Sequence, residues 1–365
     1  MSDSAPPLSV SIDAAAPRRV GYRPVDRARR ERVETGAGAM LVLAWALLGG
    51  GAGCFSLAPA PSAPGCLDNA SLEVPSPSLR AYLYSVPNHT VDARGVDWVG
   101  TALDGVDLEG VGNGCFVGGR LEGTWSQTDS WDAYHDRKAL SDGAEGHPLI
   151  VEKLHALNFG DGVSIEWSTP CPNGSASWLT VRDSLLEDMH DDAIESDGLC
   201  GVEVNGNLID RAYVAFAFRN RSNDPNRNGS NNTVVVRGNL VRMHAFPGTY
   251  LGQPGHRGIW KWADGGRGPG ISVRSNRFLA FDAPLGGTLF PDVSRVVSCA
   301  NNVFLFAGSE AEWAQALTGG CNSDDDLCDG ERLLALAHCF TVVTKPDTQS
   351  EADFLAAYWD SHVAA

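Results

Sequence analysis

The chain has 365 residues, and Asp and Glu outnumber Lys and Arg by 45 to 28, which gives a formal charge of -17 at pH 7. A chain of this length can bury a large core. So acidic a surface argues against a nucleic acid partner, because phosphate binding needs a basic surface, and a polyanionic ligand would require a local basic patch.

The first 54 residues are expected to lie outside the fold. An arginine-rich segment is followed by an apolar run, 40–48, and by small residues that end at Cys54. This order is typical of a secretory signal, and the run is too short for a membrane-spanning helix. The sequence Gly51-Ala-Gly-Cys54 also resembles a bacterial lipobox, with Gly51 at the usual aliphatic position. Cys54 is therefore either lipidated or part of an ordinary cleaved signal.

Both outcomes predict an exported protein of bacterial type that is extracellular, periplasmic or anchored to the outer membrane by lipid. Residues 55–80 are rich in Pro, Ser and Ala, as in a flexible tether. From 81 to about 148, Gly and Asn recur at turn-like intervals, and we expect the first coils of a repeat there.

Six segments of alternating apolar and polar residues follow, starting at Leu149, Leu179, Val202, Val234, Ile271 and Val297. Five carry a small polar residue five places after the start: Ser184, Asn207, Asn239, Asn276 and Asn302. Such a repeat indicates a chain that stacks coil on coil, and like side chains on successive coils form a ladder at about 4.8 Å spacing. We therefore predict an all-β fold, a right-handed parallel β-helix (a solenoid), over 81–345.

Helical spacing in 309–317 and 347–365 predicts a helical C-terminal part, with 346–365 covering the open end of the coils. Of nine cysteines, eight remain when Cys54 is set aside, enough for four disulfides in an oxidising compartment. Cys321 and Cys328 flank an acidic loop and could close it, and the other pairings stay open.

The second halves of four coils overlay as well: residues 161–166, 192–197, 214–219 and 258–262. Alternation turns one set of side chains outward: Ser164, Glu166, Glu195, Asp197, Ala217, Arg219 and Lys261. Stacking would put Glu195 and Lys261 two coils apart, roughly 10 Å by strand spacing. Asp191 and Asp192 are expected at the bend before Glu195. Three further residues could lean in from neighbouring bends: His190, His256 and Arg257.

This mixture of charged side chains is compatible with three functions. Paired carboxylates hydrolyse glycosidic bonds, carboxylates holding Ca²⁺ beside a Lys or Arg base eliminate uronate linkages, and the same face could bind sugar without reaction. The residues expected to be catalytic are Asp191, Asp192, Glu195, His256 and Lys261. Those expected to bind substrate are His190, Asp197, Arg219 and Arg257. A lyase would hold Ca²⁺ through Asp191, Asp192 and Glu195, whereas a hydrolase needs no cofactor.

Ordinary structural roles compete with these interpretations. Outward acids on a protein of charge -17 are usually solvated. Glu195 and Arg219 would then form a surface ion pair worth under about 1 kcal/mol. Trp260 and Trp262 fit a core better than a sugar platform, and His190 could simply bond a backbone carbonyl.

The chain resembles the pectate-lyase-like superfamily of right-handed β-helices. Polygalacturonase-type glycosidases of that superfamily carry Asp-Asp, then Gly-His-Gly, then Arg-x-Lys. Here Asp191-Asp192, Gly255-His256 and Lys261 stand in the same order. Arg257 replaces the second Gly, and no upstream Asn-Thr-Asp is evident.

A closer resemblance, over about 150–345, is to a group of uncharacterised exported bacterial β-helix repeat proteins. It rests on HDDAIESDG, GHRGIWKW and CFTVVT. It implies the fold and the place of the site but leaves the reaction open. We expect either a polysaccharide hydrolase or lyase, or a non-catalytic module that binds a glycan or a protein. The expected partner is a polysaccharide or cell-surface glycan, the expected state is a monomer, and membrane contact would come only through Cys54.

Overall fold

The computed structural model describes the following residues: 66, 71–73, 81–84, 89–101, 105–110, 114–124, 126, 129–135, 137–142, 148–165, 171, 173–174, 178–219, 228–249, 252–263, 267–319, 321 and 327–344. The predicted leader with Cys54, residue Glu166 and the predicted helical tail 346–365 lie outside them. The described strands begin at 71–73, inside the segment predicted to be a tether, so the fold starts earlier than expected.

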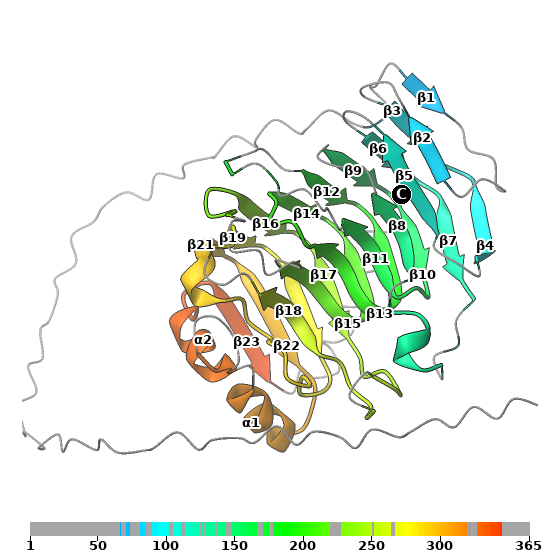
Figure 1. Ribbon diagram of the computed structural model, residues 1–365. Coiled ribbons are helices and arrows are strands. Elements are labelled where there is room, and N and C mark those ends of the chain that lie inside the picture. Colours follow the sequence, from blue (N-terminus) through cyan, green and yellow to red (C-terminus); the bar gives the residue numbers. More distant parts are fainter. Residues whose placement is uncertain are drawn as a thin grey trace, which may run out of the picture. The chain divides into compact units, whose positions relative to one another are not determined.

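Two sheets of parallel strands make up most of the described chain (Figure 1). The first, sheet A, has nine strands: β1 (Ser71–Glu73), β3 (His89–Asp92), β6 (Gly114–Val117), β9 (Leu149–Glu152), β12 (Leu179–Arg182), β14 (Val202–Asn205), β16 (Thr233–Arg237), β19 (Gly270–Arg274) and β21 (Val296–Ala300). Each strand pairs with the next in this order, so segments 18 to 37 residues apart become neighbours.

Sheet B has fourteen strands. Ten form its main path: β2 (Ala81–Tyr84), β5 (Val106–Gly110), β8 (Lys138–Asp142), β11 (Asp161–Ile165), β13 (Leu185–Ser196), β15 (Leu208–Arg219), β17 (Leu240–Met243), β20 (Arg277–Ala280), β22 (Asn302–Phe306) and β23 (Phe340–Thr344). Four branch from it: β4 (Asp97–Thr101), β7 (Arg120–Gly123), β10 (His155–Leu157) and β18 (Gly258–Ala263). The fold is therefore all-β and parallel, as predicted.

The branches arise because β13 and β15 are each 12 residues long and pair differently along their length. The first part of β13 pairs with β10 and the last part with β11. The first part of β15 pairs with β17 and the last part with β18. The C-terminal halves of these two long strands, with β11 and β18, carry or adjoin most of the residues predicted to form a site.

The predicted column of small polar residues forms a hydrogen-bonded ladder, which we call the asparagine ladder: Ser184, Asn207, Asn239, Asn276 and Asn302. In each asparagine pair the Nδ2 atom donates to the Oδ1 atom of the next residue, at 3.0 to 3.1 Å. Every member is at most 1% exposed. The prediction of stacked segments is confirmed at this column.

The residues that alternation turns inward build the core. Val163, Ile194, Phe216 and Trp260 follow one another in register on β11, β13, β15 and β18, and none is more than 2% exposed. The Trp260 ring lies 5.0 Å from that of Phe216. The prediction that the tryptophans belong to the core is confirmed for Trp260, and Trp262 packs against that core while partly buried.

Two helices lie near β21, β22 and β23 (Figure 1). The first, α1 (Glu310–Thr318), matches the predicted helix and begins with a capping box between Ser309 and Glu312. The second, α2 (Asp329–Ala335), was not predicted. Within the described part of the chain, no helix is long and apolar enough to cross a bilayer.

The eight cysteines other than Cys54 pair into four disulfides: Cys66–Cys115, Cys171–Cys200, Cys299–Cys339 and Cys321–Cys328. The last of these closes the acidic loop, as the spacing predicted. Four disulfides fit an oxidising, exported environment.

Candidate functional site

A β-bulge in β13 positions the two adjacent aspartates. Between Met189 and Asp192 strand β13 advances three residues, while its partner β15 advances two, from Ala212 to Val214. Side chains on a regular strand alternate between faces, so neighbouring residues would point apart. The bulge re-aims the chain and lets Asp191 and Asp192 approach the same cation. These residues lie inside a strand, not at the bend that was expected.

Strand register then stacks the charged residues. Ser164, Glu195, Ala217 and Lys261 follow one another on β11, β13, β15 and β18. The prediction that Glu195 and Lys261 lie two strands apart is confirmed. The residue between them is alanine, whose small side chain leaves room for Lys261 to reach back across β15.

The cations pair closely with the acids. The Nζ atom of Lys261 lies 2.6 Å from Oδ2 of Asp192 and 3.9 Å from Oδ1 of Asp191. Arg219 donates from Nη2 to Glu195 at 3.0 Å and from Nε to Asp197 at 2.8 Å.

On the strand before, the Ser164 hydroxyl donates to Oε2 of Glu195 at 2.8 Å, and Oδ1 of Asp161 accepts from the backbone N–H of Asp192 at 3.0 Å. We call seven of these residues the charged cluster: Asp161, Asp191, Asp192, Glu195, Asp197, Arg219 and Lys261.

Four of the five acids of the cluster are buried and Asp191 is partly buried, which corrects the expectation of a solvated outer face. Asp192 and Asp197 are 0% exposed and Glu195 is 2% exposed. Part of the cover is apolar, because Phe246 packs with Tyr213, Val214 and Ala217 over this side of β15. The ion pair of Glu195 with Arg219 is thus not a surface pair. Breaking a buried pair costs far more than breaking an exposed one, since it leaves a buried charge uncompensated.

Burial and mutual repulsion separate the pKa values of the acids. Burial, with repulsion from neighbouring carboxylates, raises the pKa of Asp161 and Asp192 well above the ordinary value. Burial raises the pKa of Asp191 to about 6, although Lys261 favours its ionised form. Burial also raises the pKa of Asp197 to about 7.

Glu195 behaves in the opposite way. Burial alone would raise the pKa of Glu195, but Lys261 and Arg219 outweigh it and hold that pKa below its ordinary value. Burial would lower the pKa of Lys261, yet Asp192 and Asp191 raise it above the ordinary value. The pKa of Arg219 is raised too, because the acids outweigh its burial. The cluster therefore places an ionised Glu195 among protonatable aspartates and fixed cations.

The two predicted histidines make their contacts elsewhere. His256 is 0% exposed, and its Nε2 atom lies 3.1 Å from the carbonyl oxygen of Asp282. His190 is 2% exposed, and its Nε2 atom lies 3.1 Å from Oδ1 of Asn158, not from the backbone carbonyl considered above. Burial lowers the pKa of both to about 4, so both are neutral at pH 7. In this buried state neither ring can contact a ligand.

The glycines beside His256 have a packing cause. A Cβ on Gly258 would lie 2.6 Å from the carbonyl oxygen of Thr288, and one on Gly255 would lie 2.4 Å from the Leu285 side chain. Both residues also have positive φ, at 144° and 152°. The segment GHRG is therefore fixed by its close approach to residues 285–288. Its match to a Gly-His-Gly element does not require a ligand.

Arg257 adjoins the cluster. Its charge is among those that favour the ionised form of Asp191. It also lines a cavity of about 50 Å³ beside β18, together with Lys261, Trp260 and Arg332. Lys261 thus lies between this cavity and the acids.

The predicted Ca²⁺ ligands are only partly brought together. Carboxylate oxygens of Asp161, Asp192 and Glu195 lie within 4.8 Å of one another, so Asp161 stands where Asp191 was expected. The Oδ1 atom of Asp192 is buried and has no hydrogen-bond partner among the residues that the structure describes. Ca²⁺ needs six to eight oxygens, however. These three residues are at most 3% exposed and the Lys261 ammonium already neutralises Asp192, so the set fits Ca²⁺ poorly.

Sequence reasoning missed Asp161 and Lys138. Lys138 pairs in register with Asp161, and its charge helps to hold Glu195 ionised. The alignment of 161–166 with 192–197 already placed Asp161 opposite Asp192 at its first position, so the sequence did indicate that these two acids lie side by side.

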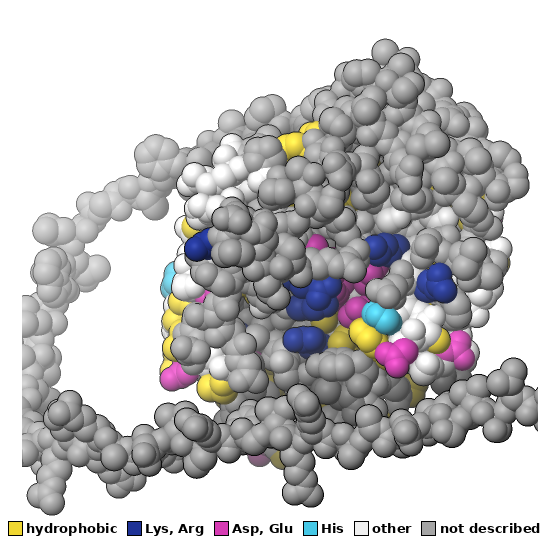
Figure 2. Space-filling model, viewed as in Figure 1, with side chains coloured by type: hydrophobic (Ala, Val, Ile, Leu, Met, Phe, Trp, Pro, Cys, Tyr) yellow, Lys and Arg dark blue, Asp and Glu magenta, His cyan; other side chains and the backbone are white. Residues whose placement is uncertain are grey.

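On the face over these strands, Lys and Arg side chains lie beside Asp and Glu side chains (Figure 2). The Arg219 side chain is 33% exposed, far more than the Glu195 and Asp197 it covers. A ligand on this face would therefore meet Arg219 before Glu195 and Asp197. Comparison with protein-family models, with curated proteins and with solved structures finds no match to this chain.

Proposed function

We propose that the chain is an exported, pectate-lyase-like β-helix that hydrolyses an acidic polysaccharide at the charged cluster. The right-handed β-helix is supported by strands that alternate between two sheets and by the parallel pairing of all the named strands. Crossovers between parallel strands are right-handed in nearly all proteins. The asparagine ladder fits the same arrangement.

The observation that carries the hydrolase proposal is the state of Asp191. Its side chain is 13% exposed, whereas those of Asp192, Glu195 and Asp197 are 0 to 2% exposed. Its pKa, raised by burial to about 6, keeps a proton available in mildly acidic solution. A carboxylic acid with these properties suits the general acid that protonates a glycosidic oxygen.

Glu195 is the partner of that acid. Lys261 and Arg219 hold its pKa low, so it is ionised when Asp191 is protonated. Glycoside hydrolysis needs this combination, because an ionised carboxylate stabilises the positive charge on the sugar ring or orients the attacking water.

Hydrolysis is favoured over elimination by the state of the cations. Elimination next to a uronate carboxylate needs a base to remove a proton, and the candidate bases on this face are Lys261 and Arg219. Neighbouring acids raise the pKa of both groups above their ordinary values, which keeps them protonated. They suit binding and charge stabilisation better than proton abstraction.

The acidic substrate is favoured by the local charge. Four cations act on the cluster: Lys138, Arg219, Arg257 and Lys261. Burial and neighbouring carboxylates raise the pKa of Asp161 and Asp192, which disfavours their ionised forms. The exposed rim is therefore basic on a protein of charge -17, and uronate or sulfate groups would find their counter-ions there.

A non-catalytic glycan-binding module is the second candidate. The observation that favours it is the close pairing of the buried acids, since Asp192, Glu195 and Asp197 each contact a cation within 3.0 Å. Such a network could serve only to hold Arg219 and Lys261 in place for an anionic glycan.

One experiment separates the two candidates. The full chain is incubated with neutral and acidic polysaccharides, with and without EDTA, while reducing ends and the absorbance of unsaturated uronates are followed. The hydrolase predicts new reducing ends without that absorbance, insensitive to EDTA and lost in Asp191→Asn and Glu195→Gln. The matched control is Asp210→Asn, which removes the partner of Arg242. Binding without product from any polysaccharide would support the module instead.

Export by a signal or a lipid anchor at Cys54 stays part of the proposal. Mass spectrometry of the mature N-terminus tests it, because lipidation would leave a diacylglycerol mass on a new N-terminal Cys54. Cleavage elsewhere would support an ordinary signal.

A further inference from the structure

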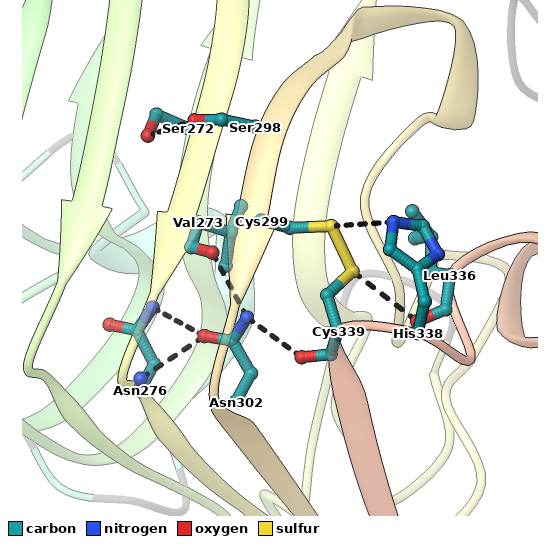
Figure 3. The surroundings of a disulfide bond; sticks show 9 residues. All are labelled: Ser272, Val273, Asn276, Ser298, Cys299, Asn302, Leu336, His338 and Cys339. Carbon is teal, nitrogen blue, oxygen red and sulfur yellow. Dashed lines mark hydrogen bonds between the residues drawn. A yellow bond between two sulfur atoms is a disulfide. The ribbon is translucent and has the colours of Figure 1, made fainter. Parts of the chain in front are cut away.

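A histidine lies against the disulfide that closes the C-terminal end of the sheets (Figure 3). Cys299 belongs to β21, the last strand of sheet A, and Cys339 precedes β23. The Nε2 atom of His338 is 3.7 Å from the Sγ atom of Cys299. Ligand atoms of the three residues all lie within 4.8 Å of one another. Thiolates and imidazole are ligands that Zn²⁺ prefers. Here the two sulfurs are bonded to each other, so they can act as thiolate ligands only after the S–S bond is reduced.

Backbone contacts hold the two cysteines without help from the S–S bond. Cys299 pairs in register with Val273 on β19. The carbonyl of Cys339 accepts hydrogen bonds from the backbone N–H and the Nδ2 atom of Asn302, at 3.0 and 3.2 Å (Figure 3). The next five residues pair with β22. Cleavage of the disulfide would therefore leave both sulfurs close together.

The arrangement is open on one side. His338 is exposed and Cys299 is partly exposed, whereas Cys339 is buried at 3%. A thiol reagent can thus reach the Cys299 sulfur, and a metal ion can arrive from the same side. Solvent is available to complete the coordination.

We propose that reduction of the Cys299–Cys339 disulfide creates a site for Zn²⁺ or a similar borderline-soft divalent ion, with Cys299, Cys339 and His338 as ligands and water as the fourth. A dithiol breaks the S–S bond and is oxidised to its own disulfide, while two electrons and two protons pass to the cysteines. Metal binding then releases both thiol protons to solvent. Side-chain rotation must separate the sulfurs to roughly 3.8 Å, as tetrahedral Zn–S bonds of about 2.3 Å require.

The proposal is specific to this disulfide. Among the described residues, two groups are spaced to hold a metal: this one and the three carboxylates of the charged cluster. The cysteines of the other three disulfides belong to neither group. The pair Cys321–Cys328 is therefore the matched control.

The test uses the full chain, reduced with dithiothreitol, desalted without oxygen and titrated with Co²⁺, whose thiolate complexes absorb in the near ultraviolet. The reduced protein should bind one Co²⁺ with this absorbance, lose it to Zn²⁺, and show none when oxidised. His338→Ala should weaken binding about tenfold or more, and the double variant Cys321→Ser/Cys328→Ser should bind as the wild type does. Absence of the band, or equal affinity in His338→Ala, would overturn the proposal.

A second measurement uses the wild type alone, so it does not depend on folding of a variant. The reduced protein is alkylated with and without Zn²⁺, and the labelled cysteines are identified by mass spectrometry. Zn²⁺ should protect Cys299 and Cys339 more strongly than Cys321 and Cys328. Equal labelling of both pairs would contradict the site.

Discussion

The asparagine ladder and the charged cluster are both groups of polar side chains that parallel strands bring together, yet close packing affects them differently. In the ladder each Asn Nδ2 donates to the Oδ1 of the next residue, so a repeated amide satisfies itself. In the cluster the closely spaced groups are carboxylates, and repulsion of Asp192 by Asp191 and Glu195 on the same strand adds to burial in raising the pKa of Asp192. Close spacing of like groups thus stabilises the amides and disfavours ionisation of the acids.

The difference between the two groups lies in the hydrogen bonds that their side chains can make. An amide carries both a donor and an acceptor, whereas an ionised carboxylate only accepts. Closely spaced carboxylates therefore need protons or cations between them, and Lys261 and Arg219 supply the cations. Four predictions test this comparison, in order of decreasing effect.

Asp191→Asn replaces a carboxyl group of the cluster with the amide of the ladder. We expect cleavage of an acidic polysaccharide to fall about 10²- to 10⁴-fold, because an amide cannot give up the proton. Stability should be unchanged or higher, since one buried acid is removed. Reducing-end assays and thermal melts measure the two effects. Asp210→Asn should retain activity, and an active Asp191→Asn would contradict the assigned role.

Asn239→Asp makes the reciprocal change in the ladder. The new carboxylate would face the oxygens of Val204 and Asn276, to which Nδ2 of Asn239 now donates. We expect a loss of about 3–5 kcal/mol in the free energy of unfolding, measured with urea at pH 7. The control Asn231→Asp lies on the surface and should cost at most about 0.5 kcal/mol. Equal losses in the two variants would show that the ladder is not sensitive to charge.

Lys261→Met removes the cation that neutralises Asp192 and favours ionisation of Asp191. We expect a loss of about 2–4 kcal/mol at pH 8 and a smaller loss at pH 5, where the aspartates can take up protons instead. Arg237→Met breaks an ion pair with Glu203 whose side chains are 45% and 28% exposed, and should cost under about 1 kcal/mol at either pH. If the loss of stability in Lys261→Met did not depend on pH, the charge of Lys261 would not be its cause.

The pH dependence of the wild type is the smallest predicted effect. The pKa of Asp191 rises from 3.8 to about 6 on folding, and that of Asp197 from 3.8 to about 7. Between 3.8 and these values the folded state binds more protons than the unfolded one, so this contribution falls as pH rises through that window. We expect a net decrease of the order of 1–3 kcal/mol between pH 4 and pH 8, less than the two shifts alone would give at about 1.4 kcal/mol per pKa unit, because the lowered pKa of Glu195 acts in the opposite direction. Urea titrations should give a flatter profile for Asp191→Asn, and an unchanged profile would contradict the raised pKa.

The periodicity of the chain predicted most of the fold. Recurring alternation and the spaced residues Ser184 to Asn302 indicated stacked parallel strands, and the hydrogen bonds of the ladder confirm it. The overlay of second halves also predicted the register of Glu195 with Lys261. A repeat in the sequence can predict such a fold, because each segment pairs only with the segments directly before and after it in the sheet.

The burial of the site and the roles of its flanking residues were not predictable in the same way. The bulge in β13 that lets Asp191 and Asp192 face one cation is a local insertion without its own sequence signature. Phe246, which packs in one apolar cluster with Tyr213, Val214 and Ala217, comes from outside the aligned segments. His256 looked like a site residue by its order in the chain, but the tight approach of Gly258 to Thr288 explains its motif.

The sequence was enough to predict which side chains lie next to each other on neighbouring strands, because apolar alternation and repeat length fix the register of parallel strands. Tertiary structure alone decided which of them are buried, which acids meet a cation and which pKa values move. Those properties depend on how closely distant segments cover a strand and how much water they exclude, and a repeat pattern carries no record of either.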